Sequence, residues 1–141
     1  MPRITRTVTI AATPERLWDE VGAFGDVGDW HPMLNSVEIH ADGKRVTRVA
    51  PAKGGGTQVE RLQTLDAERH LYRYTMERSD LPVRDYTGEF QIVPAGDVAS
   101  TVSWSAKFEL APEGDGRTVE AVRQFLQAGT ESLRRRYSDA S

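Results

Sequence analysis

The clearest pattern in the sequence is the alternation of apolar and polar residues along three segments of its second half. Apolar residues, with one glycine among them, take every second position over residues 72–76, 86–92 and 102–110. Such an alternation places the apolar side chains of a strand on one face. The three segments therefore predict strands of an antiparallel sheet with one buried, aromatic-rich face and one solvated face.

Four earlier segments carry weaker strand patterns and are bounded by turn-forming residues. They are residues 3–10, 36–40, 45–50 and 57–65. Between the second and third of them, Asp42-Gly43 predicts a tight hairpin turn. Three consecutive glycines end the segment Ala50–Gly56 and leave its backbone little steric restraint. We expect this segment to be among the most mobile parts of the chain.

Helix signals occur in three places. Thr13 is a good N-cap and Pro14 suits the first helical position, so a helix should begin there and end at the glycines within residues 22–25. Residues 30–34 predict a second short helix. Over residues 117–137, apolar side chains recur at steps of three and four, which is typical of a long amphipathic helix.

The order of these elements predicts the class of fold. One strand, two short helices, six strands and a long helix follow one another, and such segregation of helices from strands is typical of α+β proteins. We predict a seven-stranded, curved antiparallel sheet wrapped around the long C-terminal helix, with two short helices after the first strand. Residues 1–141 are expected to form one domain.

A cavity is the next expectation, because one helix covers only part of the apolar face of such a sheet. The remaining face is either filled by side chains or left open. The aromatic residues of three strands lie on the same face and should meet the apolar stripe of the helix, which favours an open space between them. The residues expected to line it are Tyr74, Met76, Tyr86, Phe90, Trp104, Phe125 and Gly129. The Ala50–Gly56 segment should form one lip of the entrance.

Composition narrows the class of function. The chain has 18 Lys and Arg against 21 Asp and Glu, a net charge of −3, which argues against a nucleic-acid partner. There is no cysteine, and His31, His40 and His70 lack metal-ligand spacing, so we expect no cofactor and no metal. No apolar run is long enough to span a membrane, and no signal peptide is visible. A cytoplasmic monomer or homodimer without stable membrane insertion is expected.

Several short stretches of the sequence resemble those of known proteins. They are Leu17-Trp18, Gly25-Asp26, Trp30-His31-Pro32, Thr57-Gln58-Val59-Glu60-Arg61-Leu62, Leu65-Asp66 and Leu81-Pro82-Val83-Arg84-Asp85-Tyr86. With the order of elements, they resemble the helix-grip superfamily of START and Bet v 1-like (birch-pollen-allergen-like) proteins, often called SRPBCC proteins. Within it, the chain is most similar to bacterial polyketide cyclase/dehydrase-like proteins. The resemblance implies a helix-grip fold over nearly the whole chain.

The strings also resemble those of plant abscisic-acid receptors. That resemblance implies a gating loop at Ala50–Gly56 and a second loop at Leu81–Val83. It implies that His31 lies near the position of a receptor lysine that pairs with a ligand carboxylate. Since histidine is often neutral near pH 7, the resemblance implies a carboxylate ligand less strongly than it implies the fold. The pocket-lining positions it implies are Glu60, Tyr74, Met76 and Tyr86.

Two main hypotheses about function remain open. The first is a carrier or binding protein for an apolar or aromatic small molecule, such as a polyketide-, lipid- or terpenoid-like compound. The second is a polyketide cyclase or dehydratase. A partner-regulated receptor is a weaker third, suggested by the gate-like loops. The expected ligand-binding residues are Trp30, Tyr72, Tyr74, Met76, Tyr86, Phe90, Trp104, Phe108, Phe125, Gly129 and Leu133.

The enzyme hypothesis needs acid/base groups, and the candidates are His31, Glu60 and Tyr86. His31 could turn into the cavity or be hydrogen-bonded within a loop. The strand around Glu60 is polar on both faces, so parity does not decide whether Glu60 or Arg61 points inward; the resemblance favours Glu60. Alternatively, Glu60 lies on the surface and forms an ion pair on the face of the sheet that carries Arg61, or with Arg73.

Overall fold

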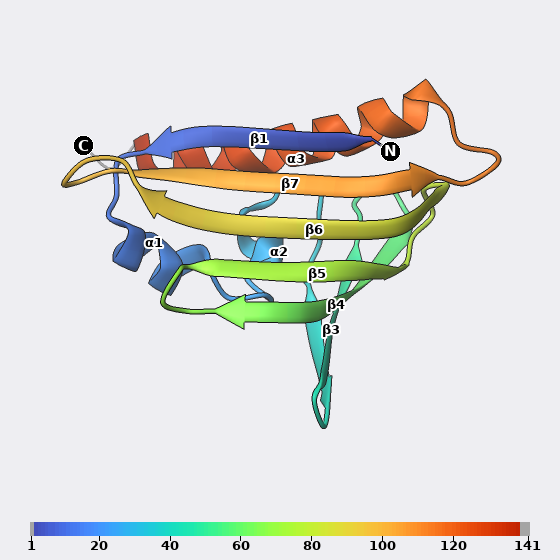
Figure 1. Cartoon of the computed structure of the whole chain (residues 1–141), viewed down its shortest axis with the longest axis horizontal. Helices are drawn as coiled ribbons and strands as arrows, with labels where there is room; N and C mark the ends of the chain where they lie inside the picture. Colours follow the sequence, from blue (N-terminus) through green and yellow to red (C-terminus); the bar gives the residue numbers. More distant parts are fainter. Residues whose placement is uncertain (1, 139–141) are drawn as a thin grey trace.

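Seven antiparallel strands form one curved sheet, and a long helix lies across its concave face (Figure 1). The computed structural model describes residues 2–138. The strands are β1 (Arg3–Ile10), β2 (Glu38–Asp42), β3 (Arg45–Pro51), β4 (Thr57–Asp66), β5 (Leu71–Arg78), β6 (Val83–Pro94) and β7 (Ser100–Leu110). Their order in the sheet is β1-β7-β6-β5-β4-β3-β2. This architecture confirms the predicted α+β class and the seven-stranded sheet.

Three helices complete the fold: α1 (Pro14–Val21), α2 (Val27–Trp30) and α3 (Gly116–Ser138). In Figure 1, α3 runs behind β1 and β7 along most of their length. The Thr13 cap is confirmed, since its hydroxyl accepts a hydrogen bond from the Arg16 N–H at 3.3 Å. The predicted second short helix exists, but it lies earlier than the expected residues 30–34. Proline disfavours helical backbone in the residue before it, and His31, which precedes Pro32, is extended, so α2 ends at Trp30.

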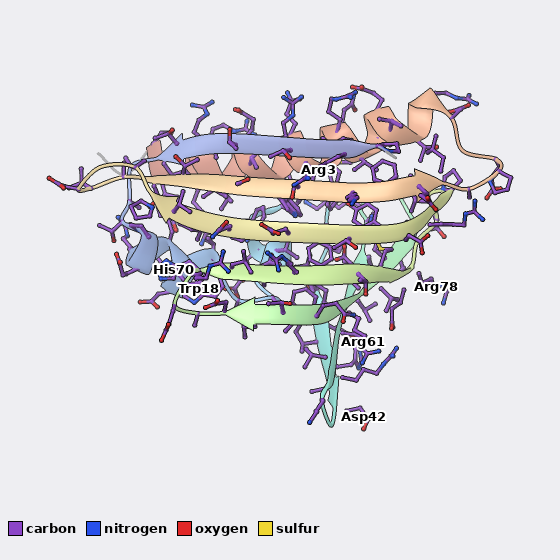
Figure 2. All side chains as sticks on the ribbon, in the orientation of Figure 1. Arg3, Trp18, Asp42, Arg61, His70 and Arg78 are labelled. Carbon is purple, nitrogen blue, oxygen red and sulfur yellow. The ribbon has the colours of Figure 1, made fainter. Side chains whose placement is uncertain are left out.

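The β2–β3 hairpin projects from the sheet, and Asp42 lies at its tip (Figure 2). The predicted strand 36–40 begins two residues too early, because β2 is Glu38–Asp42. The turn is also shifted by one residue. Asp42 pairs with Arg45, so Gly43 and Lys44 form the two-residue loop. Gly43 has a φ of +60°, which favours glycine at this position.

The concave face of the sheet is covered by aromatic rings that pack against α3. The fully buried aromatic side chains of β5, β6 and β7 are Tyr72, Tyr74, Phe90, Trp104 and Phe108. They face buried residues of α3, among them Leu126, Gly129 and Leu133. At Gly129, a Cβ atom would lie 2.6 Å from the Trp104 ring and 2.7 Å from the His31 ring. The helix therefore approaches the rings as closely as a glycine allows.

Strands β5 and β6 separate towards the hairpin that joins them. They pair from Leu71 with Gln91 to Thr75 with Thr87. Beyond that point β5 continues along β4, whereas the start of β6 stays with β7. A bulge at Asp85, whose φ is +52°, accompanies the separation. The loop 79–82 bridges the two separated strand ends at the open end of the sheet.

Candidate functional site

A pocket of about 190 Å³ lies at the open end of the sheet. Four segments meet there: the residues after α2, the β3–β4 loop with the start of β4, the β5–β6 loop, and the first half of α3. Its lining residues are Met33, Leu34, Ala52, Gly55, Gly56, Thr57, Gln58, Ser79, Asp80, Leu81, Ala121 and Phe125. We call it the mouth pocket. Apolar side chains and loop backbone make up most of its wall, which suits an apolar guest.

The lip of the mouth pocket is held by backbone hydrogen bonds between two loops. The Asn35 N–H donates to the Pro51 carbonyl at 2.9 Å, and the Lys53 N–H donates to the Met33 carbonyl at 3.0 Å. On the opposite side, the Asp80 carboxylate lies directly over Gly56, where a Cβ atom would collide with it. Gly56 also has a φ of +86°, so both space and backbone favour glycine there. The expected lip therefore does line a pocket.

His31 is buried beside α3, and both of its ring nitrogens are occupied. Its Nδ1 accepts a hydrogen bond from the Met33 N–H at 3.1 Å. The neutral ring therefore carries its proton on Nε2, which donates to the Phe125 carbonyl at 2.8 Å. The imidazole stacks on the Phe125 ring, with the two centroids 4.0 Å apart. His31 ties the end of α2 to the middle of α3 and does not line the mouth pocket.

The electrostatic surroundings of His31 keep it neutral. Burial lowers its pKa to about 4, and the positive charge of Arg48 also disfavours its protonation. At pH 7 the ring is uncharged. Of the two possibilities left open by the sequence, the structure has the hydrogen-bonded histidine.

Glu60 points inward and forms a buried ion pair with Arg48. The two residues face each other across β3 and β4, and Arg48 Nε donates to Glu60 Oε1 at 2.7 Å. Glu60 is 4% exposed and Arg48 is 1% exposed. The inward orientation of Glu60 agrees with the expectation. The alternative partner Arg73 pairs instead with Glu89, on the outer face.

Arg48 makes two further hydrogen bonds within the protein. Its Nη1 donates to the Phe24 carbonyl at 2.8 Å and to the Tyr72 hydroxyl at 3.3 Å. The guanidinium carbon lies 4.2 Å from the centroid of the Phe24 ring and 4.5 Å from that of Tyr74. Sequence reasoning missed this residue. Its signal was parity, because Arg48 alternates with Val46 and Ala50 on the inward side of β3.

The tyrosines of the concave face pack as core residues. The Tyr74 ring lies over Gly88, where a Cβ atom would overlap it, and its hydroxyl accepts a hydrogen bond from Trp104 Nε1 at 2.9 Å. Tyr72 stacks on Phe90 with a centroid distance of 5.2 Å. Burial raises the pKa of Tyr72 and Tyr74 above the usual value, so both are neutral.

The predicted position of the cavity is therefore wrong. The space between the middle of the sheet and α3 is filled, because large rings from the sheet reach the helix at Gly129. Trp30 also enters this space and packs edge-on against Trp104 at 5.4 Å. Tyr86 stacks on Phe108 at 5.6 Å. The mouth pocket lies further out, between the loops.

The predicted site residues thus fall into three groups. Phe125 lines the mouth pocket. Met76 and Tyr86 line a smaller pocket of about 60 Å³ in the gap between β5 and β6, which shares Ser79 with the mouth pocket. The predicted residues that lie in the core are Trp30, His31, Glu60, Tyr72, Tyr74, Phe90, Trp104, Phe108, Gly129 and Leu133.

Most of the residues around the mouth pocket were not predicted. Met33 and Asp80 lie in loops, where no periodic pattern marks a side chain as inward. Gln58 lies on β4, two residues before Glu60 and on the same face of the strand. Ala121 lies on α3 between the apolar positions used in the prediction.

At the opposite end of the sheet, Trp18 and His70 lie together, with ring centroids 5.6 Å apart (Figure 2).

Residues 2–138 offer neither a metal-binding cluster nor a membrane-spanning helix. No group of three or more His, Asp or Glu side chains in this part of the chain is arranged to hold a metal ion. Within the same range, no helix combines the length and the apolar character needed to cross a bilayer.

An antiparallel sheet that curves around a C-terminal helix, with a loop-lined pocket at one end, defines a helix-grip protein. The chain belongs to the family described as polyketide cyclase / dehydrase and lipid transport, whose model matches residues 1–138. This confirms the resemblance seen in the sequence. Among curated proteins, no relative matches the chain.

Solved structures of several helix-grip proteins superpose on nearly the whole chain. The protein XoxI from Bacillus cereus is 24% identical and has a TM-score of 0.91, with 99% of this chain and 98% of that chain covered. A START superfamily protein from Mycobacterium smegmatis is 17% identical, with a TM-score of 0.79 and 99% of both chains covered. The ZhuI aromatase/cyclase from Streptomyces sp. R1128 is 18% identical, with a TM-score of 0.77 and coverage of 97% and 93%. At these identities the likeness establishes the fold.

Proposed function

We propose that the protein binds a small apolar molecule in the mouth pocket and carries it without converting it chemically. The observation that carries the proposal is the pocket wall, which consists mainly of apolar side chains and loop backbone. Its volume of about 190 Å³ lies below the roughly 300 Å³ at which sites for drug-sized ligands begin. A short chain or a single ring is the matching guest. Lipid transport is one of the activities in the family description.

The hypothesis of a cyclase or dehydratase has less support from the geometry. Acid/base catalysis needs a group within hydrogen-bond reach of the substrate. His31 is neutral and has both nitrogens bonded to backbone groups, and Glu60 is paired with Arg48. Neither residue lines the mouth pocket. Tyr86 lines the smaller pocket, where burial raises the pKa of its hydroxyl and keeps it protonated, so no phenolate is present to act as a base.

Binding can be tested with 1-octanol as a short apolar probe and amide NMR shifts as the readout. We expect the largest shifts at Ala52, Gly56 and Leu81, with saturation as octanol is added. Ala121→Phe places a ring in the pocket and should weaken octanol binding at least about tenfold, since the displaced contact area is apolar. The matched control is Gln124→Phe, on the exposed side of the same helix, which should leave affinity unchanged. No saturable shifts at these loops in the wild-type protein would overturn the proposal.

A further inference from the structure

We infer that the mouth pocket selects apolar ligands whose polar end is neutral or cationic and rejects carboxylates, and that Asp80 sets this preference. The inference rests on the proposed function and names the class of ligand that the pocket would take. Its ground is the distribution of charge around the pocket. Among the described residues that line the pocket, Asp80 is the one with an ionisable side chain.

Asp80 has a defined place at the lip. Its carboxylate lies over Gly56, against the backbone of the opposite loop, so the negative charge stands at the edge of the apolar space. The other side chains in the wall with polar atoms are Thr57, Gln58 and Ser79, which are uncharged. A ligand hydroxyl or ammonium group at this edge would donate a hydrogen bond to the carboxylate. A ligand carboxylate there would meet a like charge.

Arg48 and His31, two basic residues buried on the concave side of the sheet, do not line the mouth pocket. Arg48 is fully buried and already donates to Glu60, to the Phe24 carbonyl and to the Tyr72 hydroxyl. His31 donates its single ring proton to the Phe125 carbonyl. A carboxylate inside the pocket would therefore lose water without gaining a partner, which is strongly unfavourable.

The remaining nearby cations lie outside the pocket wall. Lys53 is exposed on the same loop as Ala52, and Arg78 is exposed next to Ser79. Neither lines the pocket. Their charges stay in water, where an interaction with a bound ligand is weak and screened by salt. Asp80 is exposed as well, but unlike these two cations it lines the pocket.

The test compares three eight-carbon probes that differ in the polar end: 1-octanol, octylamine and octanoate. Dissociation constants are measured by calorimetry at pH 7.4 and low ionic strength. We expect octanol and octylamine to bind, and octanoate to bind at least about tenfold more weakly than octanol, because its charge is left unpaired. In Asp80→Asn, octylamine should lose roughly three- to fivefold in affinity, as expected for one exposed charge pair. Octanoate should gain by a similar factor. Octanol should change less than either charged probe, because an amide oxygen still accepts a hydrogen bond from its hydroxyl.

The matched control is Asp97→Asn, which makes the same charge change in the exposed β6–β7 loop, away from the pocket wall. It should alter none of the three affinities by more than about twofold, since distant exposed charges are screened. Octanoate binding as tight as octanol overturns the inference and leaves the proposed function standing. The same holds if Asp80→Asn and Asp97→Asn behave alike. Failure of all three probes to bind the wild-type protein overturns the proposed function, and this inference with it.

Discussion

The interior beneath the middle of α3 and the mouth pocket are built in opposite ways. In the interior, rings fill the space and polar groups bond to one another: Trp104 donates to Tyr74, and Arg48 donates to three acceptors. At the mouth, the glycine-containing β3–β4 loop, the β5–β6 loop and a few apolar side chains surround an open space. This helix-grip sheet therefore uses most of its concave face for packing and has an open pocket at one end.

Within residues 2–138, two buried side-chain nitrogens lack a hydrogen-bond partner: Arg6 Nε and the indole nitrogen of Trp30. A buried donor left unpaired costs about 1–3 kcal/mol. Trp30 nevertheless packs on Phe90 and Trp104, and its apolar contact area offsets that cost.

The largest effect should come from breaking the buried ion pair in the interior. Glu60→Ala leaves the Arg48 guanidinium buried without its carboxylate, which typically costs about 3–5 kcal/mol of unfolding free energy. Urea denaturation measures the loss. Glu89→Ala breaks the partly exposed pair with Arg73 and should cost below about 1 kcal/mol. Equal losses of unfolding free energy in the two variants would contradict a strong contribution of the buried pair. The double variant Arg48→Met, Glu60→Leu should recover most of the loss, because it removes both charges.

An intermediate effect should appear on acidification, through the histidine between the two regions. The pKa of His31 is lowered from 6.5 to about 4 on folding, so below pH 6.5 the unfolded chain binds a proton that the folded protein does not. Its contribution is fully present above pH 6.5 and falls as the pH decreases towards 4, by about 3 kcal/mol in total.

The pH effect is measured as the difference in unfolding free energy between the wild type and His31→Gln at several pH values, which cancels the carboxylate contributions. The gap in favour of the wild type should shrink steadily from pH 7 to pH 4. His40→Gln is the control, because His40 is exposed and pairs only with Glu38 on the same strand. A gap that does not vary with pH would contradict the burial of a neutral His31.

The smallest change in stability should come from the mouth. Met33 is 43% exposed and lines the pocket, so Met33→Ala should alter the unfolding free energy by less than about 1 kcal/mol. Octanol affinity should nevertheless fall about three- to tenfold, because part of the apolar wall is removed. Ile39→Ala is matched in exposure, at 45%, but lies on β2 outside the pocket and should leave affinity unchanged. Equal affinities of the two variants would show that octanol binds elsewhere.

The sheet could be predicted from the sequence because alternation is a local property that decides which face of a strand is buried. Tyr72, Phe90 and Trp104 all lie on the predicted face. Whether that face encloses a cavity was not predictable in the same way. The answer depends on how closely α3 approaches the rings at Gly129, which is a distance between elements remote in sequence.

The candidate site was predictable only in part, for related reasons. The inward orientation of Glu60 came from the resemblance, since its own strand is polar on both faces. Arg48 alternates with two apolar residues, which favours an inward side chain. An arginine is nevertheless expected on the surface unless a buried partner for its charge is known. Asp80 lies in a loop, where nothing in the sequence marks a side chain as facing a pocket.

The contact between Tyr74 and Gly88 has a consequence for how such proteins diversify. The two residues are direct neighbours across β5 and β6, and the tyrosine ring occupies the space that a side chain at 88 would need. At this point of the sheet the interior is therefore filled by the Tyr74 ring and not closed off by the backbone. A lineage could replace the tyrosine by a small residue and gain a deep chamber under α3 with every strand still in register. Capacity for a large guest would then be gained or lost by single substitutions, faster than the fold itself changes.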